Sequence, residues 1–192
     1  MENFRIMRSE DPTTLFSSVR KFLMTDEATH NFVGTKVVPG SSGPERMRQA
    51  EPEDYLWVFF WMVDFTIEAT GEVLNTREFA HLTVTVRLAS ERRTAGFMAL
   101  EKSGNPCCVV GYSGPTPHGI RIAPVYTLPS YRGRGYASDL VRRVSQQLLD
   151  WGYHQVFLFT DLANPASNHN YQQVGYRSVS DVDQYHFHRR LP

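Results

Sequence analysis

The sequence has few cysteines, no long apolar run and no excess of charge of either sign. Its two cysteines are adjacent, at Cys107 and Cys108, and neighbours on a strand point to opposite faces, so no disulfide framework is expected. No apolar run reaches the roughly 18 residues that span a bilayer, and the N-terminal segment lacks the apolar core of a signal peptide. The 20 Lys and Arg balance 20 Asp and Glu, which favours neither nucleic acid nor an anionic membrane as a partner. We therefore expect a soluble, cytoplasmic protein.

The composition that remains is globular. With 192 residues, 41% of them hydrophobic, the chain suits one domain with a smaller extension. The turn-forming stretch Pro39–Pro44 is the clearest boundary. We expect an N-terminal extension of uncertain fold over residues 1–40, with a helix from about Thr13 to Thr25 and a strand within Asn31–Val38. The main domain is expected over residues 41–192.

The first part of the main domain predicts two helices. Apolar residues are dense and spread all round the helix over residues 52–70, which indicates a buried helix. Asn75, with Glu78 three residues later, has the pattern of a capping box and predicts a second helix over Thr76–Leu88. The apolar side of this second helix is expected to consist of Phe79, Leu82 and Val86.

The second part alternates between strand and helix patterns. The helix over residues 136–150 is the clearest, because its apolar residues follow a helical period and Gly152 ends it. The other expected elements are strands at 94–100, 107–112, 119–127 and 156–160, a short helix at 165–173, and terminal strand segments at 175–176 and 184–188. Strands that feed a helix and then another strand indicate an α/β or α+β domain.

A segment rich in glycine and arginine lies just before the predicted helix at 136–150. From Thr127 to Asp139 it reads TLPSYRGRGYASD. The start of a helix has unpaired backbone N–H groups and a partial positive charge, and glycines allow a ligand to approach them closely. The segment therefore predicts a site for a phosphate-sized anion, to which Arg132 and Arg134 add charge. A surface turn that caps an ordinary helix is the alternative.

Two other phosphate-binding motifs fit this segment poorly. The sequence lacks the Gly-x-x-x-x-Gly-Lys-Ser/Thr run of a P-loop. The dinucleotide-binding pattern Gly-x-Gly-x-x-Gly is approximated from Gly133 to Ser138, with Asp161 at about the distance of its acidic residue. However, Ser138 replaces the third glycine, and Pro129–Arg132 separates the strand from the glycines. Too few residues follow Asp161 to complete a doubly wound sheet.

The motif that fits best is Arg-x-x-Gly-x-Ala, at Arg132, Gly135 and Ala137. A second motif follows at the appropriate distance and reads Asn164-x-x-Ser167-x-x-x-Tyr171-x-x-x-Gly175-Tyr176. With these two motifs the chain resembles the GNAT superfamily of N-acetyltransferases over about residues 119–187. Ser167, where the family has alanine, is a small departure. The resemblance implies an α/β (α+β) fold of GNAT type, in which helices flank a central mixed, mostly antiparallel sheet, here with a helical N-terminal extension.

The resemblance also implies a co-substrate and a set of site residues. Acetyl-CoA would be the acetyl donor, and no metal is implied. Tyr171 would stand near the thioester sulfur as the catalytic residue, although it is equally placed to be a core aromatic. Asn164 would hydrogen-bond the pantetheine arm, although Asn before Pro165 also suits a turn. The residues implied in binding the cofactor are Val125, Thr127, Arg132, Gly133, Arg134, Gly135, Ala137, Ser138 and Asn164.

The implied activity is direct transfer of an acetyl group to an amine in a ternary complex. A non-catalytic acyl-CoA-binding or sensing module is the alternative, and an interaction scaffold is a further one. The identity of the acceptor, a small amine or a protein amine, is left open. The oligomeric state is also left open, with a homodimer as one alternative. No spacing selects a general base from His118 and the carboxylates Glu68, Glu72, Glu101 and Asp161. His186 and His188 lack a third ligand nearby, so a metal site is not expected.

Overall fold

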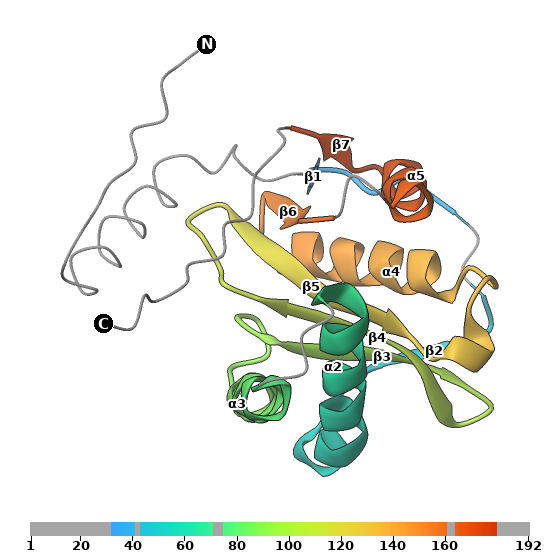
Figure 1. Cartoon of the computed structure of the whole chain (residues 1–192). Coiled ribbons are helices and arrows are strands. Elements are labelled where there is room, and N and C mark those ends of the chain that lie inside the picture. Colours follow the sequence, from blue (N-terminus) through green and yellow to red (C-terminus); the bar gives the residue numbers. More distant parts are fainter. Residues whose placement is uncertain (1–31, 41–42, 71–74, 161–163, 180–192) are drawn as a thin grey trace, which may run out of the picture.

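The computed structural model describes residues 32–40, 43–70, 75–160 and 164–179. These residues form one sheet with helices on both faces (Figure 1). The strands are β1 (Phe32–Gly34), β2 (Arg46–Gln49), β3 (Gly96–Lys102), β4 (Asn105–Ser113), β5 (Gly119–Thr127), β6 (Gln155–Leu158) and β7 (Arg177–Ser178). The helices are α2 (Tyr55–Thr70), α3 (Thr76–Leu88), α4 (Tyr136–Asp150) and α5 (Pro165–Val174), with short 3-10 turns at Pro52–Asp54 and Pro129–Tyr131.

The seven strands are arranged in the order β2-β3-β4-β5-β6-β1-β7. All neighbouring pairs are antiparallel except β5 and β6, which are parallel. This confirms the mixed, mostly antiparallel sheet that the sequence predicted. The parallel pairing runs from Gly119 opposite Gln155 to Arg121 opposite Phe157, and no pairing of the two strands follows it.

Each face of the sheet has its own hydrophobic core. Helix α4 packs its apolar stripe on one face, and its most buried residues are Leu140, Val141, Val144 and Leu148. Helices α2 and α3 cover the other face, where Val58 and Val84 meet Phe97 of β3 and Tyr126 of β5. Figure 1 shows α4 separated from α2 and α3 by the sheet. Strands β3 to β5, between the two cores, therefore form the rigid centre of the molecule.

The apolar side predicted for α3 is wrong, although its bounds are those expected. Phe79, Leu82 and Val86 are exposed, whereas Ala80 and Val84 are completely buried. The buried positions are spaced by four residues and carry small side chains, so α3 can lie close to the sheet. The predicted capping box is also absent, because Asn75 has φ 60° and its side chain makes no capping hydrogen bond.

Helix α2 is less buried than predicted. Val58, Trp61 and Met62 belong to the core, but Leu56 and Phe60 are 68% and 54% exposed. An apolar sequence all round a helix does not distinguish a buried helix from one that lies on a sheet with its outer side uncovered. The rest of the expected order holds: β5, α3 and α4 have the predicted bounds, and β6, α5 and the β3–β4 hairpin differ by a few residues.

Several expectations fall outside the described residues. They are the helix at 13–25, the strand at 184–188, the carboxylates Glu72 and Asp161, and the histidines His186 and His188. Among the helices of the described ranges, none combines the length and the apolar character needed to cross a bilayer.

Candidate active site

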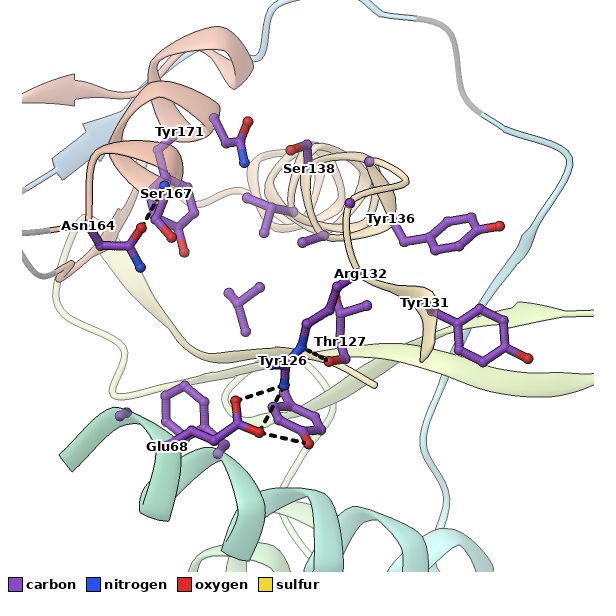
Figure 2. A pocket seen from close by; sticks show the side chains of 18 residues that line it. Glu68, Tyr126, Thr127, Tyr131, Arg132, Tyr136, Ser138, Asn164, Ser167 and Tyr171 are labelled. Carbon is purple, nitrogen blue, oxygen red and sulfur yellow. Dashed lines mark hydrogen bonds and ion pairs between the residues drawn. The ribbon is translucent and has the colours of Figure 1, made fainter. Parts of the chain in front are cut away.

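A cavity of about 660 Å³ lies between the second half of β5, the start of α4, the helix α5 and the C-terminal part of α2 (Figure 2). Its volume is in the range of small-molecule sites. Of the residues implied in binding or catalysis, the cavity is lined by Val125, Thr127, Arg132, Gly133, Gly135, Ala137, Ser138, Asn164 and Tyr171. The fold thus brings together two sequence motifs that are separated by the whole of α4 and β6.

The start of α4 presents backbone N–H groups to this cavity. Gly135 is the N-cap of the helix with φ 80°, and no side chain caps it. The N–H groups of the first three helical residues, Tyr136 to Ser138, therefore have no partner within the helix. Gly133 also has positive φ, at 72°, and a Cβ atom added to either glycine would meet no atom within 4 Å. The two glycines allow the turn and leave open space in front of the N–H groups, which fits a phosphate group.

The two arginines of the motif lie differently. Arg132 turns towards α2, where its Nη2 is 2.7 and 2.9 Å from the two carboxylate oxygens of Glu68 and its Nε donates to the Thr127 carbonyl at 2.9 Å (Figure 2). Arg134 does not line the cavity, and its guanidinium lies 5.9 Å from the centre of the Tyr131 ring. Arg132 therefore lies at the cavity, where its positive charge is paired with Glu68. Arg134 lies at the surface.

Asn164 makes the turn that the sequence offered as one alternative, and it also lines the cavity. It is the N-cap of α5, and its Oδ1 accepts a hydrogen bond from Ser167 N at 3.1 Å. The other amide atom, Nδ2, has no hydrogen-bond partner among the described residues. Tyr171 follows seven residues later, two helical turns on, so both side chains lie on the same side of α5.

Tyr171 is held between aromatic neighbours with its hydroxyl directed into the cavity (Figure 2). Its ring centre lies 6.2 Å from that of Phe32 and 6.1 Å from that of Tyr176. Burial, and to a smaller extent the nearby Cys108, raises the pKa of Tyr171 to about 12. The hydroxyl consequently keeps its proton at neutral pH and is available as a hydrogen-bond donor.

Other candidates from the sequence lie elsewhere. His118 is exposed at the far end of β5, stacked at 5.5 Å on His154. Glu101 pairs with Arg48 on the sheet edge. Both cysteines are buried, and burial raises the pKa of Cys108 to about 12, which leaves it an unreactive thiol. The described ranges contain no group of three or more side chains suited to a metal ion.

Several lining residues were not among those predicted to bind the cofactor or to act in catalysis, and Glu68 was only one of four carboxylates left open as the general base. Phe65 and Glu68 come from α2, and Tyr126 comes from β5 between two predicted residues. Glu68 is the sole carboxylate among the described residues that line the cavity. The predicted pattern covered β5 to α5, whereas α2 reaches the cavity only through the tertiary fold, so no local signal in the sequence marked Phe65 or selected Glu68 from the other carboxylates.

The comparison with protein families agrees with this geometry. Residues 45–176 match the model of the acetyltransferase (GNAT) family. The chain belongs to this family. This confirms the resemblance inferred from the two motifs, and with it the fold class.

Known GNAT proteins are similar to this chain at low identity. The thialysine N-epsilon-acetyltransferase of Sus scrofa is 29% identical over 89 residues, which are 43% of this chain and 52% of that protein. The chain therefore aligns with about half the length of this curated relative. A possible acetyltransferase from Clostridium difficile 630 matches with a TM-score of 0.61 and 15% identity, over 76% of this chain and 97% of that one. The aminoglycoside N-acetyltransferase AAC(6')-Iy in complex with CoA matches with a TM-score of 0.58 and 16% identity, over 81% and 100%.

Proposed function

We propose that this protein transfers the acetyl group of acetyl-CoA directly to an amine, in a ternary complex. The observation that carries the proposal is the open start of α4, with its two positive-φ glycines, at a cavity whose opposite side bears Asn164 and Tyr171. Acetyl-CoA supplies the activated acetyl group as a thioester. Membership of the GNAT family and the similarity to a CoA-bound acetyltransferase support this choice of donor.

The residues of the cavity suit successive parts of acetyl-CoA. The N–H groups of Tyr136, Ala137 and Ser138 bind the pyrophosphate, assisted by the partial positive charge of the helix start. Backbone groups of Val125 lie along the pantetheine arm where β5 no longer pairs with β6. The amide Nδ2 of Asn164 donates a hydrogen bond to the same arm. No metal ion takes part in the proposed reaction.

Tyr171 assists departure of the thiol as a hydrogen-bond donor. A thiol has a pKa near 8.5, whereas the pKa of Tyr171 is about 12. Complete proton transfer from the phenol to a thiolate is therefore uphill by on the order of 5 kcal/mol. A hydrogen bond to the sulfur avoids this cost and still stabilises the charge that develops as the C–S bond breaks.

The acceptor amine must also lose a proton before it can attack the thioester. For a lysine-like amine at pH 7, this deprotonation costs roughly 4.6 kcal/mol.

The first test is thermal unfolding of the purified protein in an acetyl-CoA titration. A ligand that binds the folded state alone, at 100 times its dissociation constant, adds about 2.7 kcal/mol to the free energy of unfolding. We expect this rise in the wild type and its loss in Gly135→Glu, which puts a carboxylate in the pyrophosphate site. Gly104→Glu is the matched control, because Gly104 also has positive φ and open space but lies in the β3–β4 turn. A folded wild-type protein that is not stabilised by acetyl-CoA would contradict the proposal.

The second test separates an enzyme from a binding module. Turnover is followed as thiol release with a panel of amines. Tyr171→Phe is expected to lower kcat about 10- to 100-fold and to leave the dissociation constant of acetyl-CoA within a factor of two or so. Binding without turnover of any amine in the wild type would favour the module.

A further inference from the structure

Two arginines, Arg87 at the end of α3 and Arg121 on β5, come together on the α3 face of the sheet. Ile120 and Ile122 point into the core beneath α4, so Arg121 between them projects to the opposite face. There its guanidinium lies 5.9 Å from the ring centre of Phe159. Burial lowers the pKa of Arg87 to about 10, and the positive charge of Arg121 nearby contributes to the shift.

This arginine pair has no carboxylate partner among the described residues. Five arginines of the described ranges are partly buried. Three of them form ion pairs: Arg48 with Asp54 and Glu101, and Arg142 and Arg143 with the one carboxylate of Asp139. Charges that leave water are normally paired, because an unpaired one is costly. Two like charges side by side increase that cost.

The side chain of Arg87 is held in place by contacts with three strands of the sheet. Its Nη1 donates a hydrogen bond to the carbonyl oxygen of Ala123, and its guanidinium lies 5.2 Å from the centre of the Phe97 ring. Gly111 of β4 lies directly beneath, and a Cβ atom there would fall on the guanidinium and within 2.6 Å of the Ala123 oxygen. The absence of a side chain at Gly111 is thus what allows Arg87 to reach β5.

Arg87 and Arg121 do not line the cavity, but Arg121 lies on the strand that leads into it. Arg121 is the last residue of β5 that pairs with β6, so it marks the closed end of the gap between these strands. Val125, which lines the cavity, follows four residues later, about 13 Å along the strand. The guanidinium of Arg121 lies beside Phe159, two residues beyond its β6 partner Phe157, and so on the side of the separating strands. An amine at the thioester and an anion at Arg121 therefore suit one small, elongated molecule.

We propose that Arg87 and Arg121 bind a carboxylate of the acceptor, so that the substrate is an amine that carries a carboxylate on the same molecule, at lysine-like separation. The planar guanidinium donors of two arginines match the oxygens of such a group. This inference rests on the proposed acetyl transfer and names its substrate class. The carboxylate also relieves the repulsion within the arginine pair, so that binding energy and specificity come from the same contact.

The test compares acceptors that differ in the carboxylate alone. L-lysine and cadaverine form one such pair, and kcat/KM is measured for both with the full chain. The wild type is expected to prefer L-lysine about 10- to 100-fold. In Arg121→Met this ratio falls towards one, chiefly through KM of L-lysine. Arg121→Lys restores part of the preference, and Arg93→Met, at an exposed arginine outside the pair, leaves the ratio as in the wild type.

A second readout does not require turnover. Because no carboxylate among the described residues pairs with Arg87 or Arg121, Arg121→Met is expected to raise Tm of the free protein by roughly 2–4 °C, whereas Arg48→Met, at a paired arginine, lowers it. L-lysine should stabilise the wild type more than cadaverine does, and Arg121→Met should abolish this difference. If no amine is acetylated, this comparison alone decides the inference.

The outcomes separate the two proposals. Failure to bind acetyl-CoA contradicts the proposed function, whereas equal use of L-lysine and cadaverine by an active enzyme contradicts the carboxylate site alone. Preference for 2-aminoethylphosphonate over its matched carboxylate, β-alanine, would replace the carboxylate by a phosphoryl group and overturn the assignment. A fall of Tm in Arg121→Met without any change of the acceptor ratio would assign the arginine pair to stability.

Discussion

Arg132 and Glu68 are 64 residues apart in the sequence, yet Nη2 of Arg132 lies 2.7 and 2.9 Å from the two carboxylate oxygens of Glu68. This ion pair joins the loop before α4, which we propose binds the pyrophosphate, to the helix α2. Both side chains are nearly half exposed, so the pair contributes little to stability. Its consequence is competition, because Glu68 holds the same guanidinium that the pyrophosphate of acetyl-CoA would attract.

The two partners of this ion pair are therefore predicted to act in opposite directions. Glu68→Gln frees Arg132 and removes a negative charge, and should tighten acetyl-CoA binding about 2- to 5-fold. Arg132→Gln should weaken it about tenfold. Calorimetric titration at low and high salt checks both values, and the effect of Glu68→Gln should shrink as salt rises. Equal weakening in both variants would mean that the ion pair merely holds the loop in place.

Asn164 should respond differently to two substitutions. Asn164→Asp keeps the oxygen that accepts from Ser167 N but loses the amide donor, so stability should stay within about 0.5 kcal/mol and acetyl-CoA affinity should fall. Asn164→Ala loses both groups, and unfolding should become easier by about 1 kcal/mol. Urea unfolding and acetyl-CoA titration measure the two effects. Wild-type affinity in Asn164→Asp would show that the amide does not contact the ligand.

The observed orientation of α3 can be tested with two valines on the same helix. Val84 is completely buried and Val86 is 53% exposed. Val84→Ala removes two buried methyl groups and should lower the free energy of unfolding by about 2 kcal/mol. Val86→Ala should change it by less than about 0.5 kcal/mol. The orientation predicted from the apolar spacing requires the reverse order.

The ion pair between Arg48 and Asp54 predicts a loss of stability in acid. A hydrogen bond from Arg48 is the largest cause that lowers the pKa of Asp54 from 3.8 to about 2. The stabilisation is fully present above the ordinary pKa of 3.8 and is lost as the pH falls through about 2; it amounts to about 2 kcal/mol. Arg48→Met should lower stability at neutral pH by a similar amount and make the acid dependence shallower. Urea unfolding over a series of pH values gives both results.

The elements that the sequence predicted well are those with a local cause. Helix α4 has an unbroken apolar stripe and β5 a run of alternating burial, and both have the bounds expected. The cofactor motifs were found because each of them is contiguous in sequence. The buried sides of α2 and α3 were predicted wrongly, because dense or irregular apolar residues do not say which side of a helix faces the sheet.

Contacts between distant residues were beyond the sequence. Glu68 was one of several candidate carboxylates, and nothing in its neighbourhood indicated that Arg132 would lie beside it. Arg87 and Arg121 belong to an amphipathic helix and to a strand, where each suits an ordinary exposed position. Their proximity depends on the packing of α3 on the sheet and on Gly111, whose lack of a side chain makes room for the Arg87 guanidinium.

Strand β1 lies between β6 and β7 in the sheet, although it precedes the boundary expected near Pro39. Phe32 lies in register opposite Leu158 on one side and Ser178 on the other, and its ring lies 6.2 Å from that of Tyr171. β1 can thus take its place as an inner strand only after β6 and β7, which come much later in the sequence, have been made. Shortening the chain to residues 41–192 would accordingly remove β1 from inside the sheet, and with it Phe32, which packs beside Tyr171. Such a truncation would therefore alter the sheet and the candidate active site, and would not merely remove a terminal extension.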